Sequence, residues 1–392
     1  MTIIASVGKA QSFNATEAAI QATDEALSQI GRHRVALAII AASHDFPGKQ
    51  VVDGVSGLLS DTPLFGFSTP AQLTEEGIHQ RSVVVALIAG DRVVANAGFW
   101  KLNGNFEHER ITPLSKLIQP GKEEPGTLLI VGDGTGVDGS QILDYIPPGN
   151  YPLGGCLTCG DSYPTPGFQI GGIYYDSLGL AGVHLGGDLK VGIGSNHGWQ
   201  PIGVFVRITQ AKELRLRALD GKRASEVYSR MFGYSSRDWT YPPLNRLVRL
   251  YPWGIEEPDQ QEKHLFSYSV RSPIQMEADG SLRMNPGVAQ GKTAQLLISS
   301  VENCVAAAKL AARQALQQLG GAKPVLGLVF ADIAWRIMLQ AQPGSEVEAI
   351  REIIGSDVPL IGGYSYGQFM RNTEGKPELL NQHLQVVLFG SP

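Results

Sequence analysis

The sequence contains little cysteine, which limits its redox and metal chemistry. Only three cysteines occur among 392 residues, Cys156, Cys159 and Cys304. Three thiols cannot build a disulfide framework for a chain of this length, so we expect a reducing, cytoplasmic compartment. Cys156 and Cys159 form a C-x-x-C pair, but no second pair completes a zinc site. Gly160 and Pro164 favour a loop over the helix that a redox pair opens, so we interpret this pair as structural.

Concentrated positive charge and long apolar runs are also missing. The formal net charge is −5, from 32 basic and 37 acidic residues, and no long Lys or Arg run occurs. Binding to a phosphate backbone needs a concentrated basic face, so we expect no nucleic-acid partner. No run approaches the roughly 20 apolar residues of a membrane helix, and residues 1–10 resemble a strand more than a secretory leader. We therefore expect no membrane partner.

Motifs for metal and phosphate chemistry are absent or incomplete. The eight histidines are scattered, and no H-x-x-x-H pair occurs. We therefore expect no metal and no cofactor, although His184 or His197 leaves haem open as an alternative. The segment 287–293 resembles a P-loop but is one residue short, and the pattern after it is that of a strand. A phosphate loop opens a helix at that point, so we reject this interpretation.

The composition and the hydrophobic pattern predict a folded α/β protein. Hydrophobic residues make up 43% of the chain and charged residues 18%, as in globular proteins with sizeable cores. Near the N-terminus the pattern predicts a helix over about 14–30, a fully apolar strand over 35–41 and a helix near 48–59. The C-terminal part repeats this order, with an apolar strand over 325–330 and a helix over 345–354.

A short motif recurs at the same step of each repeat. Residues 60–66 read Ser-Asp-Thr-Pro-Leu-Phe-Gly, and residues 356–362 read Ser-Asp-Val-Pro-Leu-Ile-Gly. A looser copy, Tyr-Pro-Leu-Gly-Gly, covers 151–155. Such repetition indicates duplicated α/β units. We predict an α/β fold of two related halves with mixed β-sheets and outer helices, layered α-β-β-α, with domains at 1–204 and 205–392.

The stretch between about 205 and 292 is less regular. The pattern predicts hairpins over 204–219 and 276–284, and a helix over 224–232. The segment 235–261 carries several prolines and aromatic residues without a period. We therefore predict a long surface loop or lid there.

The Pro-Leu-x-Gly loops, together with other stretches, resemble the FIST family, named for F-box and intracellular signal transduction proteins. Gly363-Tyr-Ser-Tyr-Gly-Gln368 is similar to a motif near the end of the FIST C-terminal half, and Asn381-Gln-His383 is similar to its closing motif. Arg336 stands at the position of a family arginine. The chain departs from the family pattern at four positions: Phe67 and Ile333 where cysteine is common, and Gln72 and Gln368 where glutamate is usual.

This resemblance implies a bacterial-type sensory domain that binds a small ligand. Amino acids are the ligands proposed for the family, and one branch senses nitric oxide through haem. In relatives the domain is often joined to an output domain, so for this chain we expect a separate signalling protein as the partner.

We place the ligand at the three loops that carry the motif and at Arg336. Glycines allow a close backbone approach there, and an arginine binds a carboxylate with two parallel hydrogen bonds. The predicted ligand-binding residues are Gly66, Phe67, Ser68, Gly155, Cys156, Arg336, Gly362, Gly363, Tyr364 and Tyr366. An enzymatic alternative, a hydrolase or acyl-transfer activity with Ser68 or Cys156 as nucleophile, stays open at this point.

Overall fold

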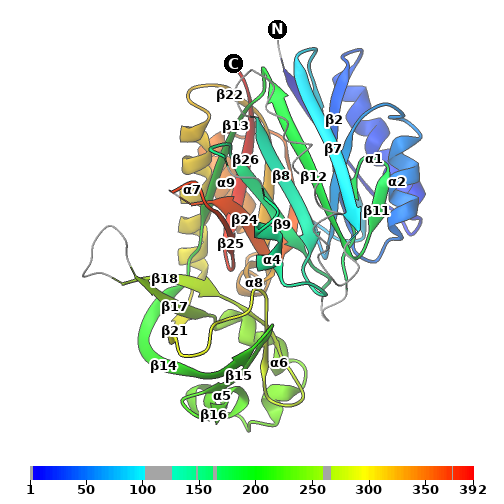
Figure 1. Ribbon diagram of the computed structural model, residues 1–392. Helices are drawn as coiled ribbons and strands as arrows, with labels where there is room; N and C mark the ends of the chain where they lie inside the picture. The colour runs from blue at the N-terminus through cyan, green and yellow to red at the C-terminus, as the bar shows by residue number, and fades with distance from the viewer. Residues whose placement is uncertain (1–2, 102–125, 147–148, 162–165, 259–265, 373) are drawn as a thin grey trace.

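The computed structural model describes residues 3–101, 126–146, 149–161, 166–258, 266–372 and 374–392 (Figure 1). Three six-stranded sheets, here called A, B and C, form the body of the molecule, and a fourth sheet lies in a smaller part at one end. The termini lie close together at the opposite end of the body (Figure 1).

Sheet A is built mainly from the N-terminal repeat, and one of its faces is covered by two helices. In spatial order its strands are β1 (Ile4–Gln11), β6 (Ser82–Ala89), β2 (Val35–Ser43), β3 (Leu64–Thr69), β10 (Gln169–Gly171) and β11 (Tyr174–Asp176). The helices are α1 (Ala15–Ile30) and α2 (Gly48–Ser56). The helix predicted over about 14–30 is confirmed as α1, which begins after Asn14, whose side chain accepts the N–H groups of Thr16 and Glu17.

Sheet B has the same plan and confirms the internal repeat. Its strands are β13 (Lys190–Asn196), β26 (Leu384–Ser391), β22 (Lys323–Asp332), β23 (Leu360–Ser365), β4 (Gln72–Thr74) and β5 (Gly77–His79). Its helices are α7 (Val301–Gln318), α8 (Ile333–Met338) and α9 (Ser345–Ile354). α7 begins after Ser300. Ser300 accepts the N–H of Asn303, while the hydroxyl of Ser299 donates to the carbonyl of Gly198.

Sheet C contains the third copy of the motif. Its strands are β25 (Pro377–Leu380), β24 (Gly367–Arg371), β9 (Leu153–Thr158), β8 (Thr127–Asp133), β12 (Gly179–Gly187) and β7 (Val93–Lys101), and the short helix α4 (Gly139–Leu143) follows β8.

The three sheets exchange hairpins in a cycle. Each motif strand is followed by a segment that pairs in a different sheet: β4 after β3 pairs with β23, β24 after β23 pairs with β9, and β10 after β9 pairs with β3. The halves of the chain are therefore interlocked, and no sheet is complete without a strand from another repeat.

The inner faces of all three sheets share one hydrophobic core, which includes Phe67 from sheet A, Phe330 from sheet B and Cys156 from sheet C. The predicted α/β class, with mixed sheets and two related halves, is confirmed. We predicted two packed sheets, whereas the described residues form three sheets around this core. The third is sheet C, which contains the looser motif at 151–155.

The remaining part, here called the accessory subdomain, covers residues 200–298. Its strands are β14 (Gln200–Lys212), β15 (Arg215–Leu219), β16 (Lys222–Arg223), β17 (Trp253–Pro258), β18 (Phe266–Arg271), β19 (Pro273–Met276), β20 (Leu282–Met284) and β21 (Thr293–Ile298). The predicted hairpins and the helix α5 (Ala224–Phe232) are present. The predicted domain boundary near residue 205 falls within β14.

The predicted lid over 235–261 is wrong for its described residues. Three short helices and β17 occupy this stretch: η1 (Asp238–Thr240), α6 (Leu244–Leu247) and η2 (Val248–Leu250). Trp239 and Trp253 are buried in the core of the accessory subdomain, where both rings pack against Tyr228. Burial of large aromatic side chains holds the segment in place although its sequence has no period. Residues 259–261 lie outside the described residues.

No helix in the described part of the chain has the length and apolar character needed to cross a bilayer.

Candidate functional site

The chain turns a corner at the carboxyl end of each of the strands β3, β9 and β23, and hydrogen bonds join these three corners. The N–H of Tyr364 donates to Thr69 Oγ1 over 2.8 Å, which joins the first and third corners. Two hydrogen bonds join the second corner to the third. Cys159 Sγ donates to the carbonyl of Tyr364 over 3.4 Å, and the N–H of Tyr366 donates to the carbonyl of Leu157 over 2.9 Å. Residues about 300 positions apart in sequence thus form one continuous centre.

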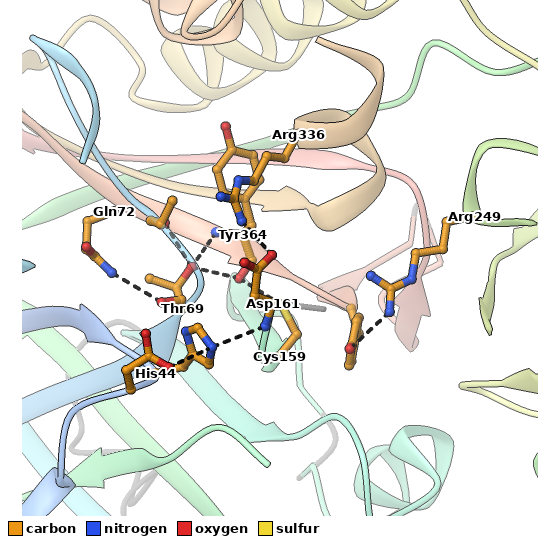
Figure 2. Close-up of polar contacts among 11 residues, drawn as sticks. His44, Thr69, Gln72, Cys159, Asp161, Arg249, Arg336 and Tyr364 are labelled. Carbon is orange, nitrogen blue, oxygen red and sulfur yellow. Dashed lines mark hydrogen bonds and ion pairs between the residues drawn. The ribbon is translucent and has the colours of Figure 1, made fainter. Parts of the chain in front are cut away.

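A partly exposed ion pair lies at this centre (Figure 2). Arg336 Nη1 lies 2.8 Å from Asp161 Oδ1, and 23% of the Arg336 side chain and 47% of the Asp161 side chain are exposed. Arg336 is presented by α8, which begins directly after β22. Asp332 caps that helix by accepting the N–H of Ala334 over 3.0 Å. A charged pair is therefore accessible where the surrounding residues are buried.

His44 supports the same pair from sheet A. It directly follows β2, and its Nε2 accepts the N–H of Asp161 over 3.4 Å (Figure 2). The ends of β2, β9 and β22 consequently contribute His44, Asp161 and Arg336 to one cluster. Of these three, only Arg336 was among the predicted site residues. The only sequence signal for His44 and Asp161 is that each lies shortly after a strand end, where parallel strands place functional groups.

The two predicted tyrosines contact different elements. Tyr364 donates through its hydroxyl to Glu346 Oε1 of α9 over 2.5 Å. Tyr366 accepts a hydrogen bond from Arg249 Nη2 of the accessory subdomain over 3.2 Å. Burial raises the pKa of Tyr366 to about 12 and holds that of Tyr364 well above its ordinary value. Both phenols therefore stay protonated at neutral pH.

Asp332 is a buried carboxyl group beside the same cluster. Its second oxygen accepts the N–H of Gln382 over 2.8 Å. Burial nonetheless raises its pKa to about 6, because desolvation outweighs these hydrogen bonds and the charge of Arg249.

Three predicted site residues point into the cores. Phe67 is fully buried, and its ring centroid lies 5.1 Å from that of Phe330. Ser68 is also buried, and its Oγ accepts the N–H of Phe168 over 2.7 Å. Burial raises the pKa of Cys156 well above that of a free thiol. These observations argue against Ser68 or Cys156 as a nucleophile, since neither side chain is exposed and Cys156 is protonated.

The predicted glycines hold the strands close together. Gly155 has φ of 135°, and its N–H donates to Gln385 Oε1 over 2.8 Å. A Cβ atom at Gly363 would lie 2.6 Å from Thr69 Oγ1, so only glycine allows the corners to meet there. Gly66 and Gly362 lie inside β3 and β23. Ligand contact by these four glycines stays a prediction.

Three glutamines brace the corners at equivalent positions. Gln72 Nε2 donates to the carbonyl of Thr69, Gln169 Nε2 to Thr158 Oγ1, and Gln368 Nε2 to Ser365 Oγ, over 3.2, 2.7 and 2.9 Å. The carbonyl of Thr69 only accepts, and the hydroxyls of Thr158 and Ser365 already donate to the carbonyls of Gly132 and Ala331. Each glutamine bond therefore needs an N–H donor, which a carboxylate lacks. This accounts for glutamine at 72 and 368, where the FIST resemblance leads us to expect glutamate.

The histidines considered for haem have contacts of their own. His197 packs edge-on against His383 with 4.8 Å between ring centroids, and its Nδ1 accepts the N–H of Trp199. Burial lowers the pKa of His197 to about 4 and that of His383 to about 3. His184 is half-buried on β12. In the described part of the chain, no group of three or more His, Cys, Asp or Glu side chains is arranged to hold a metal ion.

Two family models match the chain in succession. The FIST N domain covers residues 36–222, and the FIST C domain covers residues 224–371. No curated protein matches the chain. Among solved structures, T. maritima PurL complexed with FGAR is 11% identical, with a TM-score of 0.26 over 99% of this chain and 72% of that chain. T. maritima PurL complexed with ADP is 11% identical, with a TM-score of 0.24 over 99% and 71%. TM-scores this low do not indicate a shared fold. The two family models together span most of the sequence, and the chain therefore belongs to the FIST family.

Proposed function

We propose that this protein is a sensor that binds a small metabolite with a carboxylate group, an amino acid or a related compound, at Arg336. FIST domains have roles in sensing and signal transduction, which supports the general class. The observation that carries the specific proposal is the accessible Arg336–Asp161 pair at the junction of three strand ends.

The chemistry of this pair suits a zwitterion. A guanidinium group binds a carboxylate through two parallel N–H···O bonds, whereas within the described part of the chain Arg336 forms a single bond, to Asp161. Asp161 offers an acceptor for an ammonium group. Exposed ion pairs contribute only about 0–1 kcal/mol to stability, so a ligand carboxylate can replace Asp161 on Arg336 at little cost.

The position of the pair suits a signalling role. Asp161 lies two residues after Cys159, whose Sγ donates to the carbonyl of Tyr364 at the end of β23. Arg336 lies in α8, the helix that Asp332 caps. A ligand that moves Asp161 therefore acts on elements of all three sheets. We propose that a separate cytoplasmic signalling protein reads this change, without a nucleic-acid or membrane partner.

The test is calorimetric titration of the full chain with the common amino acids, comparing wild type with R336Q. A matched control is R215Q, because Arg215 forms a similar ion pair with Asp279 over 3.2 Å in the accessory subdomain. We expect R336Q to weaken binding by roughly tenfold or more, as loss of a charge-assisted bidentate contact does. R215Q should bind like wild type. Equal affinities for wild type and R336Q would refute the proposal.

A further inference from the structure

Arg249 is a buried cation that forms no ion pair with a carboxylate of the described residues. Only 2% of this residue is exposed. Its Nε donates to the carbonyl of Ile274 over 2.6 Å, and its Nη2 donates to the hydroxyl of Tyr366 over 3.2 Å. No carboxylate among the described residues forms an ion pair with it, and the hydrogen bonds to described residues use two of the five N–H donors of the guanidinium.

Arg249 faces the same centre as Arg336, from the opposite subdomain. In Figure 2 its guanidinium extends from the accessory subdomain toward the segment that carries Cys159 and Asp161, which Arg336 contacts from α8. Burial raises the pKa of the Cys159 thiol, and the charges of both arginines oppose that rise. Cys159 therefore lies within electrostatic reach of two cations that come from different parts of the chain.

The charge of Arg249 has one structural contact, because its guanidinium lies over the Tyr366 ring, 5.1 Å from the centroid. The backbone at position 249 does not need the charge. The segment is already held by neutral contacts, because Gln382 Nε2 donates to the carbonyl of Arg249 over 2.7 Å and to Ser272 Oγ over 2.7 Å. Burying a guanidinium without a directly paired counter-ion is unfavourable. The nearby acid Asp332 already uses both oxygens to accept backbone N–H groups.

We infer that the ligand carries two separate acidic groups, one held by Arg336 and the other by Arg249. This inference rests on the proposed function and narrows its ligand class to dicarboxylic acids, including acidic amino acids. Arg249 then serves as the counter-charge that completes the site, and the accessory subdomain takes part directly in recognition.

The test compares pairs of probes that differ by one acidic group. Calorimetric titrations of the full chain would use succinate against butyrate, glutarate against pentanoate, and aspartate against asparagine, with inorganic phosphate as a compact anion. We expect the better dianion to bind wild type at least about tenfold tighter than its partner, as one charge-assisted contact contributes. This ratio is measured on wild type and does not depend on the folding of a variant.

Variants then locate the second anion. R249Q should reduce the affinity of the dianion to that of the monoanion, and Y366F, which removes the same hydrogen bond but keeps the cation, should preserve the preference. Equal binding of both members of each pair to wild type, phosphate binding as tight as that of the best dianion, or equal losses in R249Q and Y366F would overturn the inference while leaving the proposed sensor intact. Absence of binding by every probe, amino acids included, would overturn both.

Discussion

The N–H of Tyr364 donates to Thr69 Oγ1 across 295 positions of sequence. This hydrogen bond links the corner after β3 to the corner of β23, and a side chain on residue 363 would push the two apart. The same Oγ1 lies 3.0 Å from the carbonyl oxygens of both Ala71 and Tyr364, to either of which it can donate its one proton. Thr69 thus connects the N-terminal repeat to the C-terminal repeat at the edge of the candidate site.

Thr69→Val should destabilise the protein by about 1–3 kcal/mol, because it keeps the shape of the side chain but leaves the buried N–H of Tyr364 unsatisfied. Urea denaturation followed by circular dichroism measures the change. T16A, on a less buried face of α1, is the control and should stay within about 0.5 kcal/mol of wild type. An unchanged midpoint for T69V would show that the link contributes nothing.

The raised pKa of Asp332 predicts a pH-dependent stability. Because its folded pKa of about 6 lies above the ordinary value of 3.8, protonated Asp332 stabilises the fold below about pH 4, and this contribution is lost as the pH rises through about 6. The unfolding free energy of wild type relative to D332N should therefore fall by roughly 2–3 kcal/mol between pH 4 and pH 7. A constant difference across that range would contradict the burial effect.

The buried pair His197 and His383 predicts that the stability of the fold falls as the pH is lowered, the opposite of the effect of Asp332. Both folded pKa values are lowered, to about 4 and about 3, so their contribution is complete above pH 6.5 and is lost as the pH falls toward those values. Between pH 6.5 and 4.5 the free energy of unfolding of H383Q should therefore fall by on the order of 2 kcal/mol less than that of wild type. The exposed His33 provides the control H33Q, which should retain the wild-type slope.

All three thiols should react slowly in the native protein. Cys156, Cys159 and Cys304 are buried, and burial raises the pKa of each, that of Cys304 to about 12. Ellman's reagent should therefore label them at the rate of unfolding and label all three in urea. Fast labelling of Cys156 in folded protein would revive the acyl-transfer alternative.

The sequence predicted the repeated helices and apolar strands because each follows a local rule. The stripe of α1 and the continuous apolar run of β2 depend on periods of a few residues, and Asn14 marks its helix by a short-range hydrogen bond. The family resemblance also identified Arg336 and the loops beside it. These features require no knowledge of which strands pair.

What the sequence could not predict depends on pairing between distant strands. The hairpin exchange places Gln72 beside Gly363 and Gln368 beside Cys156, and no local pattern specifies such partners. Asp161, His44 and Arg249 enter the centre for the same reason. Phe67 and Cys156 were placed in the site because they belong to the motif, but alternation along β3 and β9 turns their side chains into the shared core.

The most direct measurement of the central claim is native mass spectrometry of protein purified from cells, comparing wild type with R336Q and R215Q. The account predicts a small acidic metabolite retained by wild type and by R215Q and absent from R336Q. If R336Q retained the same mass to the same extent, the ligand would bind elsewhere, and the assignment of the sensory site to Arg336 and Asp161 would be wrong.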